Sequence, residues 1–154
     1  MFFGLVFLLN GVAKVANRFL YDWGPIRFTL ISRDSAHNIL DGAINGNGVR
    51  PLRGVRWIVN EVILPNFGTL SWALTVAEVG IGLMLLLGVA SRAAAAVAAV
   101  MQLSLNLLVI GNFAYLFEYP VEWVPLLVLA LVPAGREWGF DRRLAEAHAG
   151  CWPF

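Results

Sequence analysis

Charged residues are scarce in this chain, at 14% of its 154 residues, whereas a soluble domain usually carries about 25%. The 11 basic and 10 acidic side chains nearly cancel, which leaves a formal net charge of +1. No basic surface is therefore expected to attract phosphates, and no nucleic-acid partner is predicted. Together with a mean hydropathy of +0.72, the scarcity of charge excludes a soluble enzyme and a disordered tail.

Cysteine and histidine are rare as well. The 1 cysteine, Cys151, excludes an internal disulfide and a cysteine-cluster metal site. The 2 histidines, His37 and His148, fall on opposite sides of the membrane in the topology predicted below, so they cannot share a metal. No zinc-protease, CxxC, P-loop or dinucleotide-binding motif occurs. The sequence thus predicts no metal site and no intrinsic cofactor, and it leaves any catalytic residue unknown.

Hydrophobic residues, in contrast, make up 59% of the chain and gather in long runs. Such runs are typical of membrane-spanning helices, and the 6 Trp and 10 Phe suit two membrane–water interfaces. We predict one domain of the all-α integral membrane class, a four-transmembrane-helix bundle. The expected spans are about 1–19, 67–89, 93–111 and 120–134, with a long first loop at about 20–66 and a C-terminal tail at about 135–154.

The first apolar run is predicted to be a retained membrane helix rather than a secretory signal peptide. No basic residue precedes the run, Lys14 follows its apolar core, and no small-x-small cleavage site ends it.

The orientation of the bundle in the membrane is predicted from the distribution of basic residues. Four spans place both termini on one side and the long loop on the other, and six arginines, from Arg18 to Arg56, lie in or next to this loop. The positive-inside count by itself favours a cytoplasmic long loop.

The long first loop contains one stretch with helical periodicity, Arg53 to Leu64. Its apolar residues recur at the spacing of one helix face, which predicts an amphipathic helix ended by Pro65; they are Val55, Ile58, Val59, Val62 and Ile63. One interpretation places this helix on the bilayer surface as an interfacial helix. The other packs it on the rest of the protein, and the sequence does not separate the two.

Polar residues inside the predicted spans form the candidate site, because buried polar groups in membrane helices are usually functional or paired. The candidate cluster is Asn10, Lys14, Glu78, Gln102 and Asn106. In one interpretation the cluster binds a quinone head group or passes a proton. In the other it provides interhelical hydrogen bonds and a buried Lys14–Glu78 ion pair that fixes helix register. Glycines on the first two spans allow the close helix contact that such packing needs.

Three stretches of the sequence resemble, in their order and spacing, the motifs of a known family. They are GLVFLLNGVAK (4–14), with the pattern Gly-x-x-Phe-x-x-x-Gly-x-x-Lys; AEVGIGLMLLLGVASRAAA (77–95), with Glu-x-x-x-Gly-x-x-Leu-x-x-Gly-x-x-x-Arg; and PAGREWGFDRRL (133–144), with a terminal Gly-Arg and Asp. On these motifs the chain resembles the DoxX/DoxD family of small four-helix membrane proteins. The matched polar positions are Lys14, Glu78, Arg92, Arg136 and Asp141.

The resemblance implies a four-helix protein of the bacterial or archaeal inner membrane with cytoplasmic termini, against the bare charge count. The chain departs from the family pattern in two ways. Its first helix lacks an upstream arginine, and its first loop is longer than in the short DoxX proteins and more like the DoxD type. DoxD is the small membrane subunit of thiosulfate:quinone oxidoreductase, so the resemblance also implies a link to quinones.

Three functions follow from these observations. We expect a non-catalytic integral membrane subunit of a larger respiratory or photosynthetic electron-transport complex, contributing helix packing and a surface that faces quinone. Its partners would be membrane lipids and other membrane subunits. The alternative is the quinone-reducing membrane subunit of a thiosulfate:quinone oxidoreductase-type enzyme. The third is a small transporter lined by the polar cluster, which would need an oligomer to make room for a pore.

Overall fold

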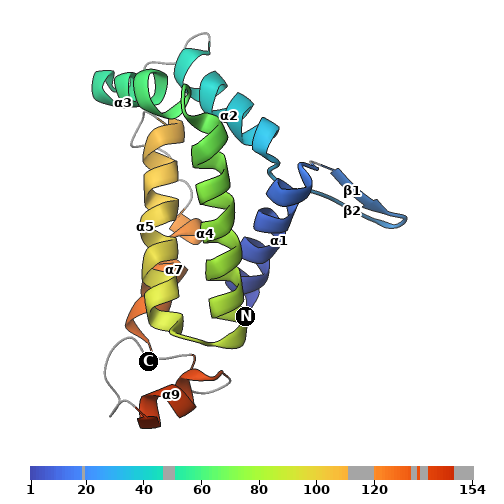
Figure 1. Ribbon diagram of the computed structural model, residues 1–154, viewed down its shortest axis with the longest axis vertical. Coiled ribbons are helices and arrows are strands. Elements are labelled where there is room, and N and C mark those ends of the chain that lie inside the picture. Colours follow the sequence, from blue (N-terminus) through green and yellow to red (C-terminus); the bar gives the residue numbers. More distant parts are fainter. Residues whose placement is uncertain (19, 47–50, 111–119, 133–134, 136–138, 148–154) are drawn as a thin grey trace.

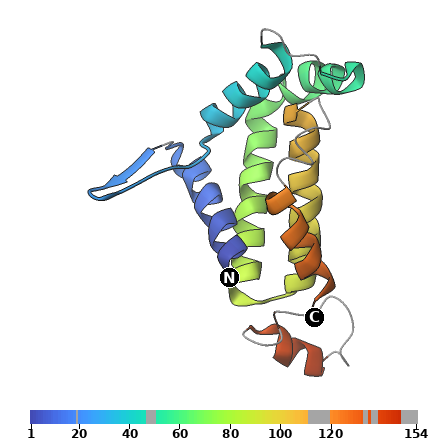
Figure 2. The same ribbon diagram turned by 180° about the vertical axis from the view of Figure 1, so that it is seen from behind.

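The computed structural model describes residues 1–18, 20–46, 51–110, 120–132, 135 and 139–147. Arg136, His148 and Cys151, which figured in the sequence analysis, lie outside these residues, as does the segment 111–119. Four helices lie side by side along the long axis of the molecule in both views of Figures 1 and 2. They are α1 (Phe2–Ala16), α4 (Phe67–Leu87), α5 (Ser91–Ile110) and α7 (Val124–Leu131).

Two of these helices are long and apolar enough to cross a membrane: α4, and residues Ser91–Leu108 of α5. The segments Phe2–Ala16 and Pro120–Leu131 are apolar but shorter, and the second consists of the 3-10 turn η2 (Pro120–Glu122) followed by α7. The predicted first span stops early because Asn17 adopts the left-handed conformation, with φ 49°, and its N–H bonds back to the last turn of the helix. The coarse prediction of a mainly helical chain with apolar spans is thus confirmed.

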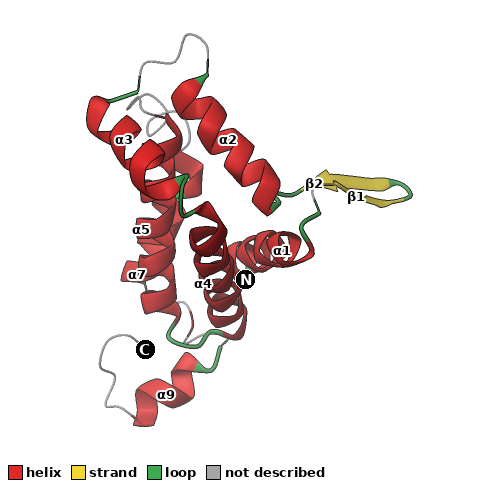
Figure 3. Ribbon diagram, turned by 45° about the horizontal axis from the view of Figure 1, so that its top comes forward, coloured by secondary structure: helices red, strands yellow, loops and turns green. Residues whose placement is uncertain are grey.

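The predicted long loop contains more regular structure than its sequence suggested. Strands β1 (Leu20–Trp23) and β2 (Ile26–Thr29) form an antiparallel hairpin, with Trp23 paired to Ile26 across the turn. Gly24 has a φ of 70°, and glycine followed by proline is well suited to a tight two-residue hairpin turn. The hairpin projects sideways from the bundle beside the end of α1 (Figure 3).

Two further helices of this loop lie across one end of the bundle, as Figure 3 shows. Helix α2 (Arg33–Asn45) begins at Ser32, whose side-chain oxygen accepts a hydrogen bond from the Ser35 N–H. Helix α3 (Arg53–Ile58) continues into the π-helical turn η1 (Val59–Ile63), so the predicted helix at 53–64 is confirmed.

The inner face of α3–η1 packs on protein. Val59 is fully buried with Leu40 and Ile44 of α2, and the partly buried side chains around them come from η1, α4 and α5. The apolar face is wider than this contact, because Ile58 and Val62 are 42% and 43% exposed. The helix therefore combines a protein-packed face with an uncovered apolar edge.

The core of the bundle itself is a separate cluster. It gathers side chains from α1, α4, α5 and α7, with partly buried Phe3, Leu85 and Met101 packed around it. Its buried members are Phe7, Ile81, Ala98, Ala99 and Leu126. The small alanines of α5 let α4 and α7 approach that helix closely. Outside this core many large apolar side chains remain exposed, including Val76, Val100 and Leu131 at 64–74%.

Candidate functional site: a buried lysine–glutamate pair

Lys14 of α1 and Glu78 of α4 form an ion pair inside the bundle. The Lys14 ammonium lies 2.9 Å from Oε1 and 2.8 Å from Oε2 of Glu78, so it donates to both carboxylate oxygens. The two side chains are only 4% and 8% exposed. Glu78 lies near the middle of the 21-residue helix α4, whereas Lys14 lies in the last turn of α1. The ion pair proposed from the sequence is therefore present.

Three glycines set the antiparallel register that brings the pair together. A side-chain carbon added at Gly4 would meet Leu86 and the Gly82 carbonyl, one at Gly11 would meet Val79, and one at Gly82 would meet the backbone of Leu8. Glycine is therefore required at these positions for the α1 and α4 backbones to touch. This register places Lys14 beside Glu78.

The structure does not bring the other three candidates into the pair. Asn10 donates its side-chain N–H to the Val6 carbonyl of its own helix, at 3.1 Å. Gln102 donates to Glu122 Oε2 at 2.7 Å, which ties α5 to η2. Asn106 is 5% exposed. Of the five predicted residues, Lys14 and Glu78 thus contact each other, and the other three lie in separate surroundings.

Asn106 differs from the others because its side-chain nitrogen is buried and has no hydrogen-bond partner among the described residues. A buried donor without a partner costs about 1–3 kcal/mol of free energy. Such a group calls for an explanation, either structural or functional. Among the described residues the amide nitrogen is therefore a buried hydrogen-bond donor without an acceptor.

Two buried hydroxyls on α4 were not singled out by the sequence analysis. Ser71 and Thr75 are 6% and 1% exposed and lie at helical spacing from Glu78. Their hydroxyls donate to the carbonyls of Gly68 and Ser71 in the same helix, at 3.0 Å and 2.7 Å. The spacing 71, 75, 78, 82 was the available signal, because it places these residues on the face of α4 that is buried.

A second polar contact lies at the end of the bundle opposite to α2 and α3, beside the turn between α4 and α5. Asp141, the first residue of α9 (Asp141–Ala147), is 1% exposed and packs against the turn between α4 and α5. Its carboxylate accepts hydrogen bonds from the backbone N–H groups of Ala90 and Ser91, at 2.5 Å and 2.8 Å, and from the Ser91 hydroxyl. Its own N–H donates to the Gly88 carbonyl at 2.7 Å. Asp141 thus supplies an acceptor to the start of α5 and a donor to the end of α4.

Arg92, another residue matched by the family resemblance, has a structural contact as well. Its Nε donates to the Ala130 carbonyl at 3.1 Å, near the end of α7. This bond ties the start of α5 to a neighbouring helix. Asp141 and Arg92 therefore both bind backbone groups of other elements.

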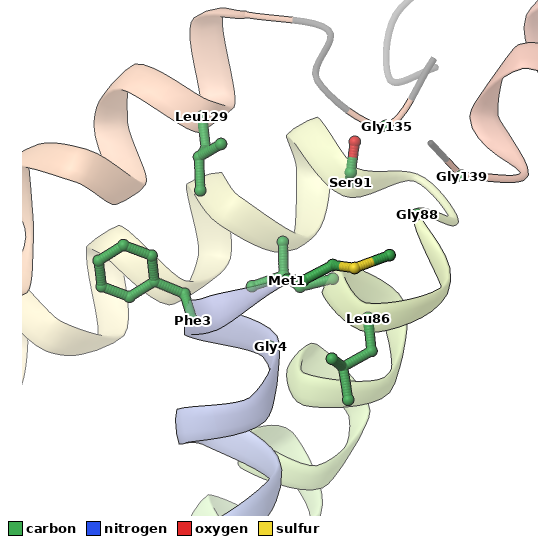
Figure 4. Close-up of a pocket in the computed structure, with 10 residues that line it drawn as sticks. Met1, Phe3, Gly4, Leu86, Gly88, Ser91, Leu129, Gly135 and Gly139 are labelled. Atoms are coloured by element: carbon green, nitrogen blue, oxygen red, sulfur yellow. The ribbon is translucent and has the colours of Figure 1, made fainter. Parts of the chain in front are cut away.

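A cavity of about 400 Å³ lies next to this turn (Figure 4). The side chains of Phe3, Leu86 and Leu129 surround it from three helices, and Ser91 lies with Gly88, Gly135 and Gly139 at one side. None of the five predicted site residues lines this cavity. A ligand in this cavity would therefore not contact the Lys14–Glu78 pair, and the candidate cluster does not form the cavity wall.

The described residues contain no group of three or more His, Cys, Asp or Glu side chains that could hold a metal ion. His37 instead packs edge-on against Phe67, with ring centroids 4.9 Å apart. Arg33 lies over the Trp72 ring at 4.2 Å, a cation–π geometry. Both contacts join α2 to the first turns of α4.

Comparisons with known proteins give no relative. No protein-family model, no curated protein and no solved structure matches the chain.

Proposed function

We propose that this chain is a DoxX-like, multi-pass protein of the bacterial or archaeal inner membrane. In this proposal it serves as a non-catalytic subunit of a larger redox or energy-transducing complex. α1, α4, α5 and the predicted span 120–134, which contains α7, would all cross the bilayer, with the termini on the cytoplasmic side. Partner subunits would carry the redox cofactors, and this chain would contribute packed helices and a surface facing the quinone pool.

The Lys14–Glu78 contact is the observation that carries the proposal. The two charges satisfy each other at both carboxylate oxygens and are almost fully buried. A charged side chain between apolar helices costs free energy unless an opposite charge lies next to it. Here glycine contacts between α1 and α4 set the register that brings the two charges together. A closed, mutually satisfied pair supports a role in holding helices together rather than in turning over a substrate.

The exterior of α1 supports placement in lipid. An outward-facing stripe of large apolar side chains runs along its whole length, with exposed fractions between 36% and 72%; it comprises Phe2, Leu5, Val6, Leu9, Val12 and Val15. A continuous apolar surface of this kind would be a liability in water but not in a bilayer. Although α1 has only 15 residues, about 22 Å of helix, a bilayer can thin locally to match it.

The uncovered edge of α3–η1 fits the same placement. Ile58 and Val62 continue the buried apolar face outward, and Trp57 is 61% exposed beside them. An apolar edge with a tryptophan is typical of helices in the membrane–water interface. In the proposed arrangement this helix is interfacial while its inner face packs on the bundle.

The first experiment is a native purification from membranes in mild detergent, followed by mass spectrometry of the subunits. We expect the chain within a larger complex that carries haem, flavin or chlorophyll on other subunits. A chain that purifies alone, monodisperse and stable would contradict the subunit proposal. A chain recovered in the soluble fraction would contradict the membrane assignment itself.

A second candidate function, a quinone-reducing subunit, is favoured by Asn106 alone. Its buried amide nitrogen, which has no hydrogen-bond partner among the described residues, is a suitable donor for a quinone carbonyl. The discriminating variant is Asn106→Leu, which removes the donor at similar size. If the intact complex reduces quinone at least tenfold more slowly, while Gln102→Leu has no such effect, this second function is the better one. Equal rates in both variants would remove it.

A further inference from the structure

Two adjacent cavities lie where α9 meets the end of α4. The inner cavity, of about 400 Å³, is the one described above, and the outer one is a shallow hollow open to the surface and lined by Leu86, Leu87, Gly139, Phe140 and Arg143. Leu86 and Gly139 line both. The two spaces are therefore immediate neighbours, and a ligand at their junction could contact both.

The two cavities differ in chemistry. The inner one is lined mainly by aliphatic and aromatic side chains from α1, α4 and α7, as Figure 4 shows for Phe3, Leu86 and Leu129. The outer one carries the exposed cation Arg143, with Phe140 51% exposed beside it. An apolar space with a cationic rim beside it matches a molecule with a hydrocarbon chain and an anionic head.

The position along the bundle narrows the choice of ligand. Both cavities lie at the end of α4 where that apolar helix stops and the polar helix α9 begins. In a chain that spans the membrane, as proposed above, this is the depth at which lipid phosphates lie. Basic pockets at the ends of membrane helices are typical binding sites for anionic lipid head groups.

We infer that these cavities bind one anionic phospholipid from the membrane leaflet on the side of the protein's C-terminal segment. One acyl chain occupies the inner cavity between α1 and α7, and the phosphate lies against the Arg143 guanidinium, a group well suited to pair with phosphate oxygens. The inference rests on the membrane placement in the proposed function. It does not depend on association with a larger complex.

Arg142 is the matched control for the head-group contact. It neighbours Arg143 on α9 and is 76% exposed, but it faces Glu146 at 3.7 Å and does not line either cavity. Leu127 is the matched control for the inner cavity. It lies on α7 like Leu129 and is 39% exposed, but it does not line the cavity.

The test uses the full chain in mild detergent, with phosphatidylglycerol and phosphatidylcholine of identical acyl chains as probes. Retained lipid is measured by native mass spectrometry, and affinity by the rise in melting temperature on lipid addition. We expect preferential retention of phosphatidylglycerol. Arg143→Gln should weaken its binding roughly fivefold, whereas Arg142→Gln should not. Leu129→Trp should abolish retention and Leu127→Trp should preserve it.

Several outcomes would overturn the inference. Equal retention of the two lipids would show that no anionic head group is recognised. Equal weakening by Arg142→Gln and Arg143→Gln would indicate only general surface charge. Displacement of the lipid by a prenylquinone would assign the cavity to a different ligand. If Leu129→Trp fails to fold, the Arg143→Gln comparison still decides, because that residue is exposed.

Discussion

Asp141 and Ser91 are 50 residues apart in the chain, yet the Asp141 carboxylate accepts hydrogen bonds from both the N–H and the hydroxyl of Ser91. A further bond from the Ala90 N–H completes a capping arrangement at the start of α5. The cap comes from a distant part of the sequence rather than from the residue that precedes the helix. This contact attaches α9 to the turn between the two longest helices.

The first prediction concerns this cap. Asp141→Ala leaves two N–H groups and one hydroxyl without their acceptor, and we expect a loss of about 3 kcal/mol in unfolding free energy. Glu146→Ala on the same helix changes an exposed side chain and should have almost no effect. Unfolding of the two variants in detergent, followed by circular dichroism, provides the measurement. Similar stability of Asp141→Ala and the parent would show that the contact contributes nothing.

The second prediction concerns the buried ion pair. Glu78→Gln or Lys14→Met alone leaves one uncompensated buried charge, and each should lower the unfolding free energy by about 3–5 kcal/mol. The double variant should lose less than either single variant, because no lone charge remains. Asn10→Leu is the control, since that amide bonds only to its own helix. If Glu78→Gln and the double variant melt at the same temperature, the energetic coupling is absent.

The third prediction compares two glycines of α4. Gly82→Ala places a methyl group against the Leu8 backbone, whereas the corresponding position at Gly80 faces open space. Overpacking at Gly82 should cost about 1–3 kcal/mol. Gly80→Ala should be neutral or stabilising by up to about 1 kcal/mol, because alanine favours helix. Thermal unfolding of both variants checks this difference, and an equal response would mean that α1 and α4 are not held at the observed spacing.

The fourth prediction concerns topology. In a Cys151→Ser background, we expect Asn38→Cys on α2 to react with a membrane-impermeant maleimide added to intact spheroplasts. Glu146→Cys on α9 should react only after the membrane is opened, because α2 and α9 lie at opposite ends of the bundle (Figure 1). The reverse pattern would invert the proposed orientation, in agreement with the arginine count. Labelling of both sites in intact cells would contradict the spanning arrangement.

The sequence by itself determined the helical character of the chain and the location of its main helices. Long apolar runs and the helical repeat of residues 53–64 are local properties, and they predicted α1, α4, α5, α7 and α3–η1 to within a few residues at most ends. The Lys14–Glu78 pair could also be predicted, because a lone acid and a lone base in adjacent apolar helices have few other partners. The hairpin and α2 were missed because both are short and lie in a segment without a long apolar run; the Gly24-Pro25 turn and the helical spacing of Leu40 and Ile44 after the Ser32 cap were the available signals.

Only the tertiary structure decided which polar residues meet. Gln102 and Asn106 share a helix face with each other by spacing, but Gln102 binds Glu122 and Asn106 has no partner in the described part of the chain. Those outcomes depend on the rotation and register of neighbouring helices. Here register follows from close contacts at Gly4, Gly11 and Gly82; these glycines indicated in the sequence that helices could approach closely, but which residues they meet depends on the partner segment. The same physics hid the role of Asp141, whose partners lie on another helix.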